Sequence, residues 1–258
     1  MASRNQHRKV IVQRPFKSYE SLLLGGTDEH INCDNVLTGA PNIASDTKGA
    51  ISLWVKPTAT VPSAVEALIS VNDTNAQNFL AISHRNDDGD LLVSAHVGGT
   101  TLWQMRTTSP PLTANTWTHV LLTHDAISPK MYVDGVDVTA MQITTDETIW
   151  MSQLTGRDNI SVGALRYNSV ETWYANGNRK DVAFWNDGFS AAEAAELYNG
   201  GAKLDYRKHS KVSNLVSWYK MDRWAWDGSN FTIYDEMENN TASTVNMEFA
   251  DIVVDNPY

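Results

Sequence analysis

The sequence predicts an all-β sandwich or barrel that carries one short helix. Three observations support this fold class: apolar and polar residues alternate over short runs, turn residues separate these runs, and a single segment has the caps of a helix. The chain has 258 residues, which fits one large all-β domain or two small ones. Regularly spaced strands of this kind are typical of sandwiches and barrels.

The first clear strand signal lies at 50–56, where apolar and polar side chains alternate up to Pro57. A hairpin is predicted next, because 79–83 and 91–97 flank the turn-forming residues 86–90. Three more apolar runs predict strands at 117–124, 160–162 and 181–185.

The strongest hairpin signal is Asp134-Gly135, which lies between the apolar runs 131–133 and 136–138. Both residues tolerate a positive φ angle, as the two central positions of a type I′ turn require. We therefore expect two antiparallel strands joined by a two-residue turn.

One helix is predicted at 190–198. Ser190 and Glu193 form a capping box, alanine-rich sequence follows to Tyr198, and Gly200-Gly201 ends the helix. Because it has only about two turns, the helix is too short to form a layer, and we expect it to plug one end of the sandwich.

Charge is distributed unevenly along the chain, whose formal net charge is −10. Residues 1–19 contain no acid, and their basic side chains are Arg4, Arg8, Lys9, Arg14 and Lys17. Residues 224–258 contain seven acids and no Lys or Arg. Since neither end has the periodic apolar face of a packed helix, we divide the chain into a basic arm at 1–20, a domain at 21–222 and an acidic tail at 223–258. We expect the tail to pack on the sandwich or to extend from it.

Composition excludes several classes of partner. An acidic body argues against nucleic-acid binding, since phosphate contacts need a basic face. No run approaches the ~18 apolar residues of a membrane span, and 1–17 matches neither a signal peptide nor a transit helix. Cys33 is the only cysteine, so neither an intrachain disulfide nor a cysteine-based zinc site can form. We expect a protein that folds in a reducing compartment without a membrane or nucleic-acid partner.

No catalytic motif is visible, and we expect that the protein is not an enzyme and has no catalytic residue or cofactor. Glu236 and Glu238 share one face of an extended strand, but the third acid of the E-x-D-x-x-E pattern found in retaining glycoside hydrolases is missing. His119 and His124 are five residues apart, so a strand places them on opposite faces and they cannot share a metal.

Two groups of side chains stay open as binding candidates. Asp87, Asp88 and Asp90 offer oxygen ligands for calcium, although their spacing is equally that of a hairpin turn. Among the nine tryptophans, four are expected to pack in the core or on a sheet face: Trp54, Trp117, Trp185 and Trp218. The other five could stack on a sugar ring, seal the ends of the sandwich or contact a neighbouring subunit: Trp103, Trp150, Trp173, Trp224 and Trp226.

Several motifs in one order resemble laminin-G-like, concanavalin A-like jelly rolls. The W-T-H-V and T-H-D sequences within 117–125, followed by K-M-Y-V-D-G at 130–135, resemble the family's central signature. Residues 21–31, 51–57 and 178–193 resemble its opening strand, its F-W-V-K-P strand and its I-D-E-V to L-S-x-x-E segment. The resemblance covers 21–222 and implies a jelly-roll β-sandwich with extended terminal arms.

The order of the motifs departs from the common arrangement. The L-V-x-W-Y-x-L-D strand that usually opens such domains resembles 215–222, near the end of this chain. This implies a circularly permuted jelly roll, a change that is tolerated when the natural termini lie close together. We then expect both charged arms to leave the same end of the sandwich.

The set formed by 196–201, 215–222 and 246–253 resembles a subset of these domains found in virion proteins of tailed bacteriophages. That resemblance implies a structural virion protein, most simply a capsid decoration or a head or tail appendage, assembled in the bacterial host cytoplasm. Its partners would be other virion proteins and further copies of itself, docked through the five basic residues of 1–19. The alternative is a lectin-like carbohydrate-binding module for attachment to a host-surface glycan.

Overall fold

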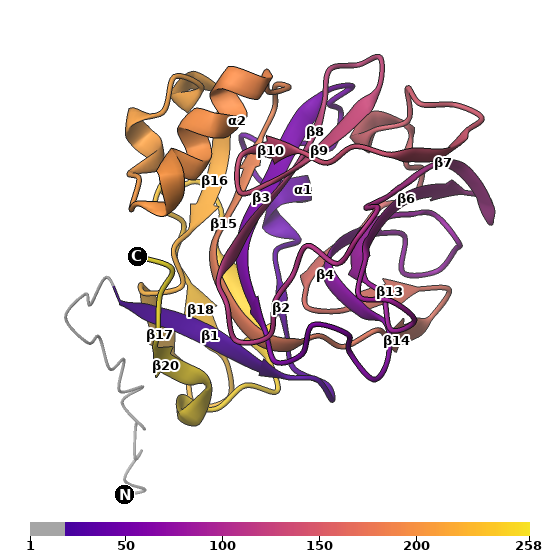
Figure 1. Ribbon diagram of the computed structural model, residues 1–258. Coiled ribbons are helices and arrows are strands. Elements are labelled where there is room, and N and C mark those ends of the chain that lie inside the picture. The colour runs from indigo at the N-terminus through magenta and orange to yellow at the C-terminus, as the bar shows by residue number, and fades with distance from the viewer. Residues whose placement is uncertain (1–18) are drawn as a thin grey trace, which may run out of the picture.

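The computed structural model describes residues 19–258 and has two large antiparallel sheets packed face to face (Figure 1). The first sheet has eight strands, and β16 pairs with β15 off the main path. In spatial order the path is β10 (Val136–Asp137), β9 (Pro129–Val133), β8 (Thr118–His124), β3 (Gly49–Pro57), β15 (Asn176–Trp185), β1 (Glu20–Gly25) and β20 (Ile252–Val254), with β16 spanning Leu215–Tyr219.

The second sheet has ten strands and forms the other layer. Its spatial order is β11 (Met141–Thr144), β7 (Thr100–Arg106), β6 (Leu91–Val97), β5 (Phe79–His84), β4 (Glu66–Asn72), β12 (Asn159–Val162), β2 (His30–Asn32), β19 (Ala242–Val245), β18 (Phe231–Ile233) and β17 (Trp224–Trp226). A separate hairpin, β13 (Leu165–Tyr167) and β14 (Val170–Thr172), packs against β4. The all-β sandwich expected from the sequence is confirmed.

Strand alternation builds the core between the two sheets. On β8, Val120 and Leu122 point inward into the main apolar cluster, whereas Leu121 belongs to a second cluster on the outer face. His119 and His124 accordingly lie on opposite faces: His119 packs against Trp54 and Tyr198, and His124 stacks on Trp150.

The hairpin at 131–138 is confirmed. Val133 pairs with Val136, and the two turn residues have positive φ angles, 49° for Asp134 and 74° for Gly135. A side chain at Gly135 would also meet Tyr198, whose Cβ lies 3.3 Å from the place of the missing Cβ. This contact joins the turn to the helix.

The helix α2 (Ala191–Tyr198) has the expected caps but a different place. Ser190 Oγ accepts a hydrogen bond from Glu193 N, and Asn199 ends the helix with a left-handed φ of 52°. Rather than plugging an end, α2 covers the outer face of the eight-stranded sheet, where Ala194 and Leu197 pack with Leu121 and Trp185 (Figure 1). The prediction of its place was wrong because the outward positions of these strands are themselves apolar.

Shorter helical turns lie in the loops. They are α1 (Asn35–Thr38) and the 3-10 turns η1 (Met151–Gln153), η2 (Asn199–Gly201), η3 (Tyr206–Lys208), η4 (Val212–Asn214) and η5 (Phe249–Asp251). Tyr206 of η3 stacks on Trp218 of β16, with ring centroids 4.7 Å apart, and so extends the cover over the outer face. Within 19–258 no helix is long and apolar enough to cross a lipid bilayer.

The two chain ends are incorporated differently from what charge alone predicts. Glu20 is already part of β1, opposite Val254 of β20, so the sheet begins at the last residue assigned to the arm. Residues 223–258 supply four strands to the two sheets, and Phe231 and Ile233 lie in the core. The acidic segment therefore belongs to the sandwich: most of its carboxylates lie at least partly exposed, but Asp235 is buried and accepts main-chain hydrogen bonds from Trp218 and Met237.

β1 and β16 lie end to end along one edge of β15 in the first sheet. Both pair with the same edge of β15: β1 with 176–179 and β16 with 182–185. The N-terminal strand and the strand expected to open an unpermuted domain are thus neighbours, which is the arrangement a circular permutation requires. The permutation itself stays a prediction.

Candidate functional site

The five candidate tryptophans fall into two groups. Trp103 on β7 is fully buried and its Nε1 donates to Ile149 O at 2.9 Å, and Trp150 is 2% exposed and stacks on His124. Neither ring reaches the surface, so the expectation that these two could contact a ligand or a neighbour was wrong. Trp103 lies on β7 and Trp150 directly before η1, and both indoles belong to the main apolar cluster.

Trp224 and Trp226 form an aromatic cluster with two phenylalanines at one end of the sandwich. Trp226 meets Phe231 at a centroid distance of 4.5 Å and Phe249 at 5.2 Å, while Trp224 meets the same two rings at 5.2 and 5.9 Å. Phe231 is fully buried and Trp224 nearly so, whereas Trp226 is half-buried and Phe249 is 46% exposed. The exposed fraction of the rings thus increases from Phe231 in the core to Phe249 at the surface, and the two outer rings are Trp226 and Phe249.

A pocket of about 610 Å³ opens beside these outer rings. We call it the Trp226 pocket. It is built from three loops that are distant in sequence: the β1–β2 loop, the β17–β18 turn and the segment between β19 and η5. Its lining residues are Asp28, Trp226, Gly228, Ser229, Asn246, Met247, Glu248, Phe249 and Ala250.

Polar groups surround the aromatic floor of the Trp226 pocket. Asn246 Nδ2 donates to Asp28 Oδ2 at 3.0 Å, which ties two of the three loops together. Asp227 Oδ1 accepts hydrogen bonds from Ser229 N at 2.9 Å and Asn230 N at 3.0 Å, which shapes the β17–β18 turn. The exposed amide, hydroxyl and carboxylate groups offer both donors and acceptors next to a ring face.

The charge at the Trp226 pocket is negative. Asp28 and Glu248 line it, and none of its lining residues within 19–258 is a Lys or Arg. Because a carboxylate-bearing ligand would meet like charges here, the pocket favours a neutral or cationic ligand.

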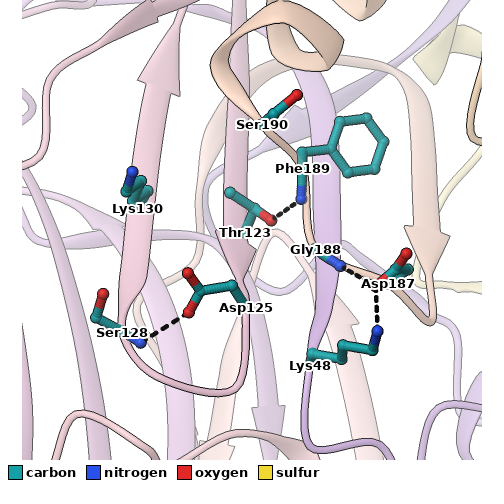
Figure 2. A pocket seen from close by; sticks show the side chains of 9 residues that line it. All are labelled: Lys48, Thr123, Asp125, Ser128, Lys130, Asp187, Gly188, Phe189 and Ser190. Carbon is teal, nitrogen blue, oxygen red and sulfur yellow. Dashed lines mark hydrogen bonds and ion pairs between the residues drawn. The ribbon is translucent and has the colours of Figure 1, made fainter.

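A second pocket, of about 350 Å³, lies on the outer face of the eight-stranded sheet near the start of α2 (Figure 2). Its polar groups are largely occupied by one another. Lys48 Nζ pairs with Asp187 at 2.7 Å, Phe189 N donates to Thr123 Oγ1 at 2.7 Å, and Ser128 N donates to Asp125 at 3.0 Å (Figure 2).

Ion pairing also sets the charge state in this second pocket. Burial raises the pKa of Asp187, but hydrogen bonds from Lys211 and Lys48 outweigh it and hold the pKa below its usual value. The ring of Phe189 packs on Trp185 and His209 in the outer apolar cluster. With its ring engaged and its ions paired, this pocket offers less to a sugar than the Trp226 pocket does.

Trp173 lines a third pocket, of about 370 Å³, together with Tyr174. Trp173 is half-buried and packs on the small apolar cluster formed by Ala67, Phe79 and Leu165. The Tyr174 hydroxyl donates to Glu171 at 3.2 Å. This pocket is the second place where a candidate tryptophan meets a concave surface.

The calcium candidates are neutralised by arginines. Arg85 Nη2 lies 3.0 Å from Asp87 Oδ2, and Arg106 pairs with Asp88 and, at 3.0 Å, with Asp90. The hydrogen bond from Arg85 lowers the pKa of Asp87. Guanidinium groups thus face these oxygens at the β5–β6 turn, and within 19–258 no group of three metal-ligating side chains occurs.

The remaining acidic pair does not converge. Glu236 lies 3.8 Å from Arg207 and Glu238 lies 3.9 Å from Arg223, so each carboxylate faces its own arginine.

Two other residues of the predicted strands, Lys56 and Trp117, both contact Asp255. The basic residues Arg4, Arg8, Lys9, Arg14 and Lys17 lie outside the described residues.

The sequence profile described as the concanavalin A-like lectin/glucanases superfamily matches residues 27–195. No curated protein sequence matches the chain. Among solved structures, the CBM40 domain of a Ruminococcus gnavus IT-sialidase, bound to α2,3-sialyllactose, is 15% identical with a TM-score of 0.55, over 70% of this chain and 98% of that one.

This chain matches only part of the length of two further solved structures. A Bacteroides ovatus protein assigned as carbohydrate-binding is 16% identical with a TM-score of 0.62, over 94% of this chain and 62% of that one. A leech intramolecular trans-sialidase is 17% identical with a TM-score of 0.58, over 74% of this chain and 29% of that one. At these identities the likeness concerns the fold.

Proposed function

Because the chain belongs to the concanavalin A-like lectin/glucanase superfamily, we propose that it is a non-catalytic glycan-binding module and that its ligand site is the Trp226 pocket. The single observation that carries this proposal is the pairing of two outer aromatic rings with exposed amide, hydroxyl and carboxylate groups in one concave surface. Aromatic faces and hydrogen-bonding groups are the two elements with which proteins bind pyranose rings. The carbohydrate-binding proteins of similar fold support the same class of function.

The charge of the pocket narrows the ligand to a neutral glycan. Asp28 and Glu248 would repel the carboxylate of a sialic acid, whereas neutral hydroxyl groups can donate to both. We therefore do not expect this chain to bind the sialyllactose that the Ruminococcus domain binds. We expect neutral hexose or N-acetylhexosamine glycans to bind in the millimolar to micromolar range.

Replacing Trp226 by alanine tests this proposal. We expect Trp226→Ala to lower the affinity for the best glycan of an array by about 10-fold or more, since it removes the ring against which the sugar stacks. Trp173→Ala is the matched control, because it removes the half-buried tryptophan of another pocket. An array without any neutral-glycan signal, or equal losses in both variants, would refute the assignment.

The structural role in a tailed-phage particle stays a prediction that depends on the resemblance of the C-terminal motifs. A glycan-binding module carried on a particle surface would combine both readings. Removal of residues 1–18 tests the docking role of the arm, because the deletion stops before β1 and leaves Glu20 in the sheet. We expect the shortened protein to fold and to fail to join particles; normal incorporation would show that the arm does not dock.

A further inference from the structure

The outer face of the eight-stranded sheet carries a buried carboxylate, Asp181. It lies in β15 where the register with β3 shifts between Lys180 and Ala183, and its φ is +47°, in the left-handed region. Such bulges re-aim a side chain at a local conformational cost. Here the bulge holds a carboxylate that is 1% exposed among aromatic residues.

Two donors satisfy the oxygens of Asp181. Trp218 Nε1 donates to Oδ1 at 2.8 Å, and the hydroxyl of Tyr258 donates to Oδ2. The nearby ammonium of Lys180 instead contacts the main-chain oxygens of Glu20 at 2.6 Å and Lys220 at 3.2 Å. The phenol is therefore a principal partner of one carboxylate oxygen.

The ring of Tyr258 packs over Asp181 and against Trp54, and we call the place that it occupies the Asp181 recess. It meets Trp54 edge to face at 5.9 Å, and Trp54 in turn packs on His119 at 5.2 Å and Tyr198 at 5.9 Å. The recess thus presents aromatic walls and a carboxylate acceptor to a hydroxyl-bearing ring of six atoms.

The segment that carries Tyr258 is held by side chains at two places. Asp255 accepts hydrogen bonds from Lys56 Nζ at 2.5 Å and Trp117 Nε1 at 3.0 Å, and Tyr258 is the second anchor. Strand pairing of β20 ends at Val254. Residues 255–258 can therefore leave the face without breaking the sheet.

A buried imidazole beside Trp54 stays unpaired while Tyr258 occupies the recess. Within 19–258 neither ring nitrogen of His119 has a hydrogen-bond partner, whereas the hydroxyls of Ser52 and Tyr206 lie against each other. All three residues are at most 1% exposed, and Ser52 lies on the same outward face of β3 as Trp54. A buried polar group without a partner is costly, and the imidazole of His119, one ring away from Tyr258 across Trp54, is such a group.

We propose that this recess is a second ligand site, one for a six-membered ring that presents a hydroxyl donor, and that Tyr258 closes it as an intramolecular ligand. A phenol and a pyranose share this chemistry. An external ring must displace Tyr258, so the affinity of the closed protein is reduced by the small fraction of molecules that are open.

Full-length Tyr258→Ala and Asp255→Ala variants test the site with p-cresol and methyl β-D-galactopyranoside as probes in calorimetry. Tyr258→Ala vacates the recess, and we expect it to bind at least one probe about 10-fold or more tightly than the native protein. Asp255→Ala keeps the phenol but loosens its segment, so we expect an intermediate affinity. The two probes distinguish a phenol-binding from a sugar-binding site.

Matched variants define the outcome that overturns the proposal. Adding Asp181→Asn to Tyr258→Ala should weaken binding about 10-fold, and toluene should bind less well than p-cresol. Tyr258→Phe keeps the ring but loses the hydrogen bond to Asp181, so its affinity for the probes should lie between those of the native protein and of Tyr258→Ala. If neither probe binds to Tyr258→Ala while its melting curve shows a folded protein, or if Asp255→Ala equals the native protein, the site does not exist. Repeating the Tyr258→Ala measurement in a Trp226→Ala background removes binding of the sugar probe at the Trp226 pocket. The gain that Tyr258→Ala produces should persist there, which separates this test from that of the glycan pocket.

Discussion

His119 is a fully buried histidine whose ring nitrogens have no hydrogen-bond partner in the described part of the chain. Its ring packs on Trp54 and Tyr198, and its main-chain N–H donates to Asp134 Oδ1 at 2.8 Å. Burial lowers the pKa of His119 to about 3. The imidazole is thus an aromatic packing element that stays neutral over the physiological range.

This burial predicts a pH dependence of stability. Between pH 6.5 and about 3 the unfolded chain takes up a proton on His119 that the folded chain refuses. The free energy of unfolding therefore carries the full contribution of neutral His119 above pH 6.5. That contribution is lost as the pH falls, by up to about 1.4 kcal/mol per pH unit. Urea unfolding at pH 7 and pH 5 should show a smaller loss for His119→Phe than for the native protein, and equal losses would contradict the prediction.

The helix α2 is a short element that depends on its caps and on the sheet below it. Ser190 and Glu193 satisfy each other's main-chain N–H groups, and Asn199 ends the helix. An isolated helix of eight residues is unstable in water. Its stability therefore comes from the capping box and from packing on the outward apolar residues of the sheet.

Replacing Ser190 by alanine measures the first contribution. The variant loses the acceptor for Glu193 N, and we expect the free energy of unfolding to fall by about 1 kcal/mol. Ser63→Ala is the control, because Ser63 is exposed and outside the helix. A loss no larger than that of the control in chemical denaturation would show that the box contributes nothing.

At the level of the whole molecule, the sandwich is closed by segments from opposite ends of the chain. β1 pairs with β20, and β2 pairs with β19, so residues near 20–32 and 242–254 share both sheets. Such non-local pairing makes the acidic C-terminal segment part of the cooperative unit rather than an appendage.

Two phenylalanines of that segment test its role. Phe231 is fully buried in the core whereas Phe249 is 46% exposed. We expect Phe231→Ala to lower the free energy of unfolding by about 3 to 5 kcal/mol and Phe249→Ala by about 1 kcal/mol or less, measured by urea titration. Similar small effects would mean that 223–258 packs only loosely.

Cys33 reports on the opening of the whole sandwich. The thiol is fully buried in the main core, and burial, aided by Asp34 and Asp235, raises its pKa well above the usual value. Ellman's reagent reacts with the thiolate form of an accessible cysteine. It should therefore modify no thiol in the native protein and one thiol after unfolding in urea. Rapid modification of the native protein would show that the core opens locally near Cys33.

Local rules account for much of what could be foreseen. The turn at Asp134-Gly135 and the box at Ser190 and Glu193 depend on residues within a few positions of each other, so their patterns predict them directly. The fold class follows from strand periodicity and from the family motifs. The opposite faces of His119 and His124 follow from the two-residue period of a strand.

Contacts between distant segments account for the rest. The Trp226 pocket combines loops near 28, 228 and 248, and the Asp181 recess is closed by Tyr258, 77 positions further along the chain. No local pattern separates a tryptophan that is buried, such as Trp103, from one that is half-exposed, such as Trp226, because burial depends on what packs over the ring. The order and turns of the strands are thus written in short stretches of sequence, whereas the sites arise from side chains that meet only when the two sheets close.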